Sequence, residues 1–418
     1  MALNTFSNGL RLVYTSRPDK RVACAVLYIA GGSQCESNYQ LGLSEYLTNM
    51  LMMGTRQHPS ASLLLEYAKK NGILLTAHNS KESISISAVC QKEKIELAIN
   101  LLSEIAFDST FDMENGNAVR NRQLDMIDMR SESPTFQLTK LTNSSLYYRT
   151  GLSSPKIGTA ISVARFNSMH AKEFMERIFT PKNTIISIVA DENQQRIYDV
   201  VKENFFDKME MNTEQYKKLK YVSKVDWNSG EVKGRVKRLN QTRFAVTFPT
   251  VTFKDKEKHL IEIVKPIILK RLNKSLAYKD YFFDTKLVTK YYANNGKITF
   301  ELSVDGENAK EHIIDFVRSI VENVKQKPIL ADEFEAEKQV YLTNYIIKYD
   351  NVLEYTLQSA KQLAIKKEMF SENAQKLVIE MLKCEDVNKL LGEVFDLRKM
   401  LVVYLGQALD LNFDEIIK

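Results

Sequence analysis

The sequence repeats one pattern of elements, and this duplication is the feature that most limits how the chain can fold. The first copy reads ISISAVCQKEKIELAINLLSEI and then FDMENGNAVRNRQLDMI, and the second reads ITFELSVDGENAKEHIIDFVRSIVENV and then LADEFEAEKQVYLTNYI. In both copies a strand leads into a long amphipathic helix, and an acidic segment opens a second helix. A duplication on this scale predicts two related α+β domains of roughly 200 residues each.

Each half also closes in the same way, with a helix that leads into an apolar strand. The first half ends with RFNSMHAKEFMERIFTPKNTIISIVAD and the second with KCEDVNKLLGEVFDLRKMLVVYLGQA. Between the halves, residues 206–241 are charged and show no periodicity, which is typical of a connection. We therefore expect an N-terminal domain over 1–205, a charged linker over 206–241 and a C-terminal domain over 242–418. Each domain should contain a mixed or antiparallel sheet with helices packed mainly on one face.

Local signals predict the elements of the first half. The chain should open with a hairpin, in which strand 11–16 and strand 21–30 are joined by a turn at 17–20. The next elements are a helix within 41–55, a helix over 61–71, strands over 72–79 and 82–90, and a long helix that begins near Ile95.

Composition excludes several classes of protein. The 418 residues are 44% hydrophobic and 26% charged, and no apolar run approaches the roughly 18 residues that a membrane span needs. The net charge of +6 is concentrated in Lys217–Arg243, and a solvated linker explains it better than a nucleic-acid site, which would add aromatic residues and a defined module. We expect a protein without a transmembrane segment and without a nucleic-acid partner.

Cysteine is scarce, and the four residues form no CxxC pair. Cys24 and Cys90 lie in strand-like apolar runs, where a free thiol behaves as a small hydrophobic group. This pattern predicts a reducing compartment and no haem or iron–sulfur site. The opening MALNTFSNGLRLVYT enters a turn and a strand directly, so we expect no signal peptide or presequence within the given chain.

The segment Leu41–Thr55, LGLSEYLTNMLMMGT, is predicted to form an amphipathic helix with an unusual polar set. Glu45, Thr48 and Asn49 are spaced i, i+3, i+4, the spacing by which a helix can present side chains to one metal ion. The opposite face is apolar and should pack in the core. Its residues are Leu43, Tyr46, Leu47, Met50 and Leu51. The polar set could therefore be a ligand set or simply the wall of a cleft.

The run NTFSNGLRLVYTSRPDKRVACAVLYIAGGSQCESNYQLGLSEYLTNMLMMGT resembles the opening of the insulinase/pitrilysin-type metallopeptidase superfamily. Its NGL turn, its glycine turn with a following acidic residue and its helix before a GT are hallmarks of the branch that contains mitochondrial processing peptidase and the core proteins of respiratory complex III. Three later segments extend the resemblance. They are FDMENGNAVRNRQLDMIDMRSESP, GLSSPKIGTAISVARF and FTPKNTIISIVAD.

The resemblance implies that a metal site has been lost. Active members carry HxxEH on this helix, with two histidines as zinc ligands and the glutamate as general base. The corresponding positions here are Glu45, Thr48 and Asn49, a poor donor set for zinc. Asp125 and Asp128 lie in the helix that should supply a further acidic ligand, and the sequence does not choose between them.

The second half departs from active relatives as well. The resemblance places Ala277 where they carry an arginine that helps to hold the substrate. The segment HLIEIVKPIILKRL contains no glycine, so it lacks the glycine-rich loop of the presequence-binding subunit of the processing peptidase. We expect no catalytic residue, no metal and no cofactor in this chain.

The five histidines do not rebuild the motif elsewhere. His170 and His259 each begin HxxE, and His312 begins HxxD, but none is followed by the second histidine. We interpret these three as surface or capping residues. His58 and His78 complete the set.

By resemblance, the chain is expected to be a non-catalytic core subunit of ubiquinol–cytochrome c reductase, peripheral to the matrix side of the mitochondrial inner membrane. Its partners would be a second homologous core subunit and the membrane-embedded subunits of complex III. The sequence does not distinguish the first core subunit from the second. The alternative is a non-catalytic subunit of a processing peptidase or other heterodimeric zinc peptidase, paired with a partner that carries HxxEH. A free-standing peptide-binding scaffold is a third possibility.

Overall fold

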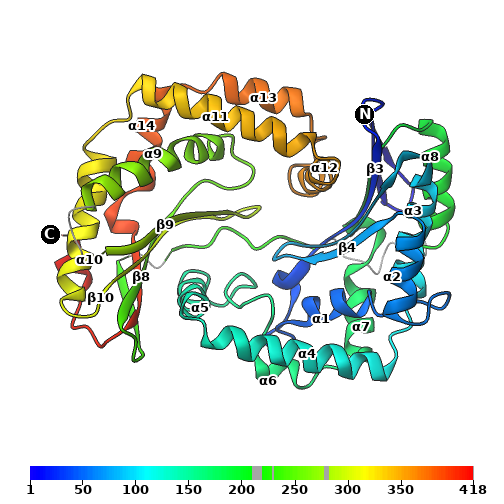
Figure 1. Ribbon diagram of the computed structural model, residues 1–418, viewed down its shortest axis with the longest axis horizontal. Helices are drawn as coiled ribbons and strands as arrows, with labels where there is room; N and C mark the ends of the chain where they lie inside the picture. The colour runs from blue at the N-terminus through cyan, green and yellow to red at the C-terminus, as the bar shows by residue number, and fades with distance from the viewer. Residues whose placement is uncertain (210–218, 228–229, 277–281, 418) are drawn as a thin grey trace. The chain divides into compact units, whose positions relative to one another are not determined.

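The computed structural model describes residues 1–209, 219–227, 230–276 and 282–417. The chain forms two compact units, and each is built around one β-sheet (Figure 1). Unit 1 contains Met1–Met129, Ser154–Tyr221 and Ile346–Ser371, and unit 2 contains Arg130–Ser153, Val222–Tyr345 and Glu372–Lys418. The α+β class with two sheets agrees with the sequence prediction.

The sheet of unit 1 has six strands in the order β1-β2-β6-β3-β5-β4. Their bounds are β1 Ala2–Thr5, β2 Arg11–Ser16, β3 Val22–Ala30, β4 Leu74–Asn79, β5 Ser83–Gln91 and β6 Thr184–Ala190. β2 and β6 are parallel, and the other neighbours are antiparallel. The sheet is therefore mixed, as predicted.

The predicted hairpin between β2 and β3 is wrong. β6 lies between these strands and pairs with both. Every residue of β6 is buried, and such an apolar strand is stable only in the interior of a sheet, covered on both faces. The turn that follows β2 therefore connects strands that are not neighbours.

One face of the unit 1 sheet carries the main core. Alternate residues of β3, among them Ala25 and Leu27, pack in one cluster with five helices. These helices are α1 Leu43–Met50, α2 Ala61–Lys70, α3 Ile95–Asp108, α7 Ser168–Ile178 and α8 Gln194–Val201. The opposite face is contacted by α12 Val352–Lys366, where Ser187 Oγ donates a hydrogen bond to the Thr356 carbonyl at 3.0 Å. Cys24 and Cys90 are buried free thiols, as predicted.

Unit 2 has a five-stranded sheet in the order β7-β11-β8-β10-β9. The strands are β7 Glu231–Val236, β8 Gln241–Pro249, β9 Phe282–Tyr291, β10 Gly296–Asp305 and β11 Leu401–Gly406. β7 and β11 are parallel, and the rest are antiparallel. One face packs against α5 Pro134–Leu146 through Ala245, Leu401 and Val403.

The remaining helices complete the two units. They are α4 Met113–Glu132, α6 Ala160–Val163, α9 Lys258–Leu276, α10 Ala309–Ile320, α11 Ala331–Asp350, α13 Glu372–Glu380, α14 Cys384–Val394 and α15 Phe413–Ile417. No helix among the described residues is both long enough and apolar enough to span a bilayer.

The units are discontinuous in sequence, unlike the consecutive segments 1–205, 206–241 and 242–418 expected from the sequence. Helix α5 belongs to unit 2 although it lies in the first half of the chain, and α12 belongs to unit 1 although it lies in the second half. The expected linker also supplies strand β7, while residues 210–218 and 228–229 within it are outside the described residues. Periodicity identifies the apolar face of a helix but not the sheet that will cover it.

Candidate functional site

Helix α1 begins at an unusual cap. The N-cap residue Gly42 has φ +94°, and the carboxylate that closes the helix start comes from Glu36, outside the helix. Glu36 accepts hydrogen bonds from the Gly42 N–H at 2.8 Å, the Ser44 N–H at 2.7 Å and the Ser44 hydroxyl at 2.5 Å. A negative group at this end also interacts favourably with the helix dipole. The glycine turn and acidic residue seen in the sequence thus fix the position of α1.

The apolar face of α1 is buried as predicted. Leu43, Tyr46, Leu47, Met50 and Leu51 are each at most 1% exposed. The Tyr46 hydroxyl donates to the carbonyl of Gly116 in α4 at 2.9 Å. A Cβ at Gly116 would come within 2.8 Å of that hydroxyl oxygen, so the close approach of α4 requires glycine there.

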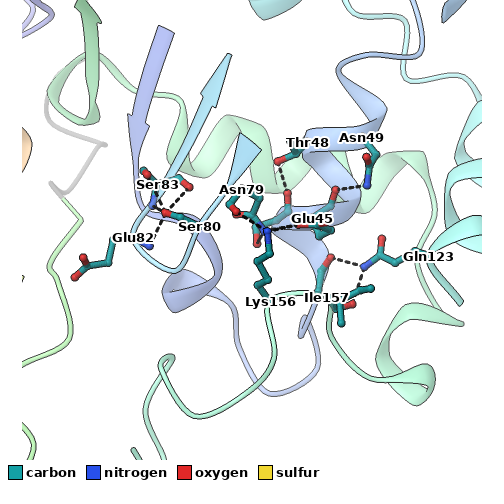
Figure 2. Close-up of polar contacts among 12 residues, drawn as sticks. Glu45, Thr48, Asn49, Asn79, Ser80, Glu82, Ser83, Gln123, Lys156 and Ile157 are labelled. Atoms are coloured by element: carbon teal, nitrogen blue, oxygen red, sulfur yellow. Dashed lines mark hydrogen bonds and ion pairs between the residues drawn. The ribbon is translucent and has the colours of Figure 1, made fainter. Parts of the chain in front are cut away.

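Glu45 is held by two residues that are distant in sequence (Figure 2). Asn79 Nδ2, at the end of β4, donates to Glu45 Oε2 at 3.1 Å. Lys156 Nζ lies 3.8 Å from the same oxygen and donates to the Asn79 backbone carbonyl at 2.9 Å. The carboxylate is therefore already occupied by an amide and an ammonium group.

Thr48 and Asn49 use their polar atoms within the helix (Figure 2). The Thr48 side chain is buried, and its hydroxyl donates to the Ser44 carbonyl at 2.7 Å. Asn49 is exposed, and its Nδ2 donates to the Glu45 backbone carbonyl at 3.0 Å. The side chains of the three residues at i, i+3, i+4 thus bond to different partners. Thr48 faces the interior of the protein.

Helix α4 contributes a residue that the sequence did not single out. Gln123 is buried, and its Nε2 donates to the carbonyls of Gly42 at 3.0 Å and Ile157 at 2.9 Å. Asp125 and Asp128, the two acidic candidates, are exposed. The spacing Gly116, Val119, Gln123 is the signal that could have revealed this face, because these are the buried residues of α4.

Burial is the main cause of the pKa shifts of Glu36, Lys81 and His78 near α1. Burial raises the pKa of Glu36 to about 7 and lowers the pKa of Lys81 to about 8. These two opposite charges interact and partly offset each other's desolvation. His78 on β4 has a lowered pKa because of burial and the nearby Lys156, while Glu45 opposes that shift.

This donor set does not fit zinc. Thr48 is a buried neutral hydroxyl, Asn49 offers an amide, and Glu45 is the sole carboxylate among the three. Zinc in proteins favours thiolate, imidazole and carboxylate donors in a tetrahedral arrangement. Within the described ranges, no group of three His, Cys, Asp or Glu residues could hold a metal ion. Ala277 lies outside the described residues.

The other histidines have structural contacts. His170 Nδ1 accepts from the Asn167 N–H at 3.3 Å and caps α7, as predicted. His259 and His312 are 5% and 9% exposed, so neither is a surface residue, which is one of the two roles predicted for them. His259 Nδ1 lies 2.8 Å from the Tyr341 hydroxyl, and His58 Nδ1 lies 2.8 Å from Glu104 Oε1. A histidine that is buried or half-buried is tolerated where it has a polar partner.

Comparison with family models identifies the group to which the chain is related. Residues 11–160 match the model described as insulinase (peptidase family M16), and residues 165–341 match the model described as the peptidase M16 inactive domain. The chain belongs to the insulinase-like superfamily. The sequence resemblance is thereby confirmed at the level of the superfamily.

Relatives of this superfamily member include bacterial and mitochondrial proteins. It is 24% identical to the uncharacterised zinc protease YmxG of Bacillus subtilis over 345 residues, which are 80% of this chain and 81% of that protein. It is 22% identical to the beta subunit of mitochondrial-processing peptidase of Dictyostelium discoideum, over 64% of this chain and 56% of that protein.

Solved structures share the fold over nearly the whole length. A protease from Helicobacter pylori superposes with a TM-score of 0.86 at 16% identity, over 97% of this chain and 99% of that chain. A chain of complex III from Candida albicans superposes with a TM-score of 0.79 at 17% identity, over 99% of both. At these identities the similarity establishes the architecture.

Proposed function

We propose that this chain is a non-catalytic subunit of a heterodimeric zinc peptidase and pairs with a homologous subunit that carries HxxEH. The observation that carries the proposal is at α1, where the zinc-helix positions hold Glu45, Thr48 and Asn49. Each of these side chains is bonded to a neighbouring group of the same unit. These positions lack histidine, Thr48 is buried, and Glu45 is already in contact with an amide and an ammonium group. We therefore infer that the helix offers no general base and no set of metal ligands.

The choice of a peptidase assembly rests on the sequence comparisons. Similarity to a zinc protease extends over 80% of this chain, and further relatives are beta subunits of mitochondrial-processing peptidase. The sequence alone favoured a complex III subunit over a peptidase subunit, and the comparisons lead us to prefer the peptidase subunit. In such a pair, this chain would be the non-catalytic subunit, and its homologous partner would perform hydrolysis.

The second candidate is a core subunit of complex III on the matrix side of the mitochondrial inner membrane. Its support is the fold shared with a chain of complex III from Candida albicans over 99% of both chains. In that case the partners would be a homologous core subunit and the membrane-embedded redox subunits.

Affinity purification of the tagged chain from its own cells tests both candidates. A soluble 1:1 complex with an HxxEH homologue, active on unfolded peptides only when both chains are present, supports the first. Co-purification with cytochrome b and cytochrome c1 supports the second and contradicts the first.

Metal analysis of the isolated chain tests the lost site directly. We expect less than one tenth of an equivalent of zinc, as an order-of-magnitude limit, since the donor set is poor. A stoichiometric, tightly bound zinc ion that supports peptide hydrolysis would overturn the non-catalytic assignment.

A further inference from the structure

Unit 2 contains a groove at one end of its sheet, and none of its lining residues belongs to unit 1. It consists of two adjoining pockets of about 490 Å³ and about 790 Å³, which share Val251, Leu390 and Glu393. The loop after β8, the turn between β9 and β10, and helix α14 contribute to its walls. Volumes of this size are typical of sites that hold a ligand or a short peptide.

Apolar side chains line part of the smaller pocket. Leu260 of α9, Val378 of α13 and Leu382 line it together with Met381, which is 77% exposed. Two lysines, Lys256 and Lys389, and three acidic residues, Glu257, Asp386 and Glu393, line it as well. A flexible methionine at the mouth of an apolar pocket can adapt to different apolar side chains.

The larger pocket is basic. Lys224, Lys254 and Lys399 line it, together with Trp227. In the part of the chain that the structure describes, neither Lys224 nor Lys399 forms an ion pair, whereas Lys254 Nζ donates to Asn294 Oδ1 at 2.7 Å. The Asp255 carboxylate in this pocket accepts from the N–H and the hydroxyl of Thr252, at 2.7 and 2.8 Å.

A buried polar atom in the same wall is left without a partner. The Thr250 hydroxyl oxygen is buried and makes no hydrogen bond with any described residue. Unpaired buried polar atoms are rare in folded proteins because each costs about 1–3 kcal/mol. Thr250 itself belongs to the wall of the basic pocket.

Hydrogen bonds between loops hold the basic pocket in place. Asn295 Oδ1 accepts from the Val225 N–H at 2.9 Å, and Asn295 Nδ2 donates to the Ser223 carbonyl at 2.9 Å. An added Cβ at Gly296 would lie 1.8 Å from the Val251 carbonyl oxygen, so the turn packs directly against the loop after β8. A wall that is already ordered loses little entropy when a ligand binds.

We propose that this groove binds a short extended segment of a partner protein, with apolar side chains in the pocket at Met381 and carboxylates among Lys224, Lys254 and Lys399. Charge complementarity identifies the occupant, because three lysines face two acidic residues in the larger pocket and one of those acids is held by Thr252. The inference goes beyond the proposed function, since it assigns a second binding surface that needs neither a metal nor α1.

The test measures binding of a synthetic peptide to the full chain. The probe is a fluorescein-labelled octapeptide with two leucines followed by three aspartates and a free C-terminal carboxylate. The control peptide has asparagines and a C-terminal amide. Trp227 is the single tryptophan of the chain, so its emission reports occupation of this pocket alongside the anisotropy of the label.

We expect the acidic peptide to bind at least about 10-fold more tightly than the control, with an affinity that falls as salt rises. The double variant Lys224→Glu/Lys399→Glu should weaken binding at least about 10-fold, and Met381→Asp should do so through the apolar pocket. Lys172→Glu, at an exposed position of α7 in unit 1, is the matched control and should bind like the wild type.

Equal affinity for the acidic and neutral peptides would overturn the proposal. So would unchanged binding in the double variant, or no binding at millimolar peptide while circular dichroism shows the fold intact. Binding that Lys172→Glu weakens as much as Lys224→Glu/Lys399→Glu would show a general charge effect and contradict a defined site.

Discussion

Helices α5 and α12 occupy equivalent places in the duplicated pattern and differ in how deeply they are buried. Each follows a 20-residue helix and begins after a side-chain cap, Ser133 for α5 and Asn351 for α12. The buried residues of α12 are Val352, Tyr355, Thr356, Ser359, Ala360, Gln362, Leu363, Ala364 and Ile365, whereas those of α5 are Leu138, Thr142, Ser145 and Leu146.

The difference follows from the sheets that the two helices cover. α12 packs on β3 and β6, whose central residues are buried on both faces, and its Ser359 and Ala360 are small enough for close approach. α5 packs on β11 and β8 and is also held by a polar contact, because Lys297 Nζ donates to Asn143 Oδ1 at 2.7 Å. The same arrangement thus rests mainly on packing in unit 1, whereas in unit 2 it also includes a buried lysine that donates a hydrogen bond to α5.

The largest effect on stability should come from a charge placed on the buried face of α12. Ala360→Asp buries a carboxylate at a fully buried position and should reduce the free energy of unfolding by about 4 kcal/mol or more. Ser145→Asp is the matched change on α5 and should cost about half as much. Urea unfolding followed by far-UV circular dichroism measures both. Equal losses would show that the two helices contribute alike.

A smaller, pH-dependent effect is expected at Lys297. Burial lowers the pKa of Lys297 to about 8 from 10.5, so the contribution of this group to stability is complete above pH 10.5 and is lost as pH falls through about 8. Lys297→Met removes the cost of burying the charged lysine. This variant should be more stable than the wild type at pH 6.5, by on the order of 2 kcal/mol.

The difference between Lys297→Met and the wild type should shrink as pH rises from 8 to 10.5. Urea unfolding across that range measures it, and Lys290→Met on β9 is the control because it replaces an exposed lysine of the same sheet. A stability difference that does not change with pH would show that Lys297 is not desolvated.

The smallest effect should come from the polar contact under α12. Ser187→Ala removes the hydrogen bond to the Thr356 carbonyl and should cost about 1 kcal/mol. Ser144→Ala, at an exposed position of α5, should change the free energy of unfolding by less than about 0.5 kcal/mol. If Ser187→Ala costs as little as the control, α12 is held by apolar packing alone.

Local patterns predicted most of the elements but few of their neighbours. The apolar face of α1 could be read from the sequence because residues three and four apart share a side of a helix. Strands 72–79 and 82–90 correspond to β4 and β5 for the same kind of local reason. The pairing of β2 with β6 could not be read, because alternation assigns faces and not neighbours.

The surroundings of α1 depend on contacts between distant segments. Glu36, Asn79, Gln123 and Lys156 come from four separate parts of the chain, and no spacing rule brings them together. The sequence therefore singled out Glu45, Thr48 and Asn49, but not the bonds that these side chains make.

The discontinuity of unit 1 also affects how the chain folds during synthesis. The last strand of its sheet ends at Ala190, but the helix that covers one face of β3 and β6 ends at Lys366. At a synthesis rate of about 5–20 residues per second, roughly 10 to 35 s pass between the completion of β6 and the completion of α12. Through this interval the ribosome-bound chain exposes an apolar sheet surface, so a chaperone that shields it should raise the yield of folded protein.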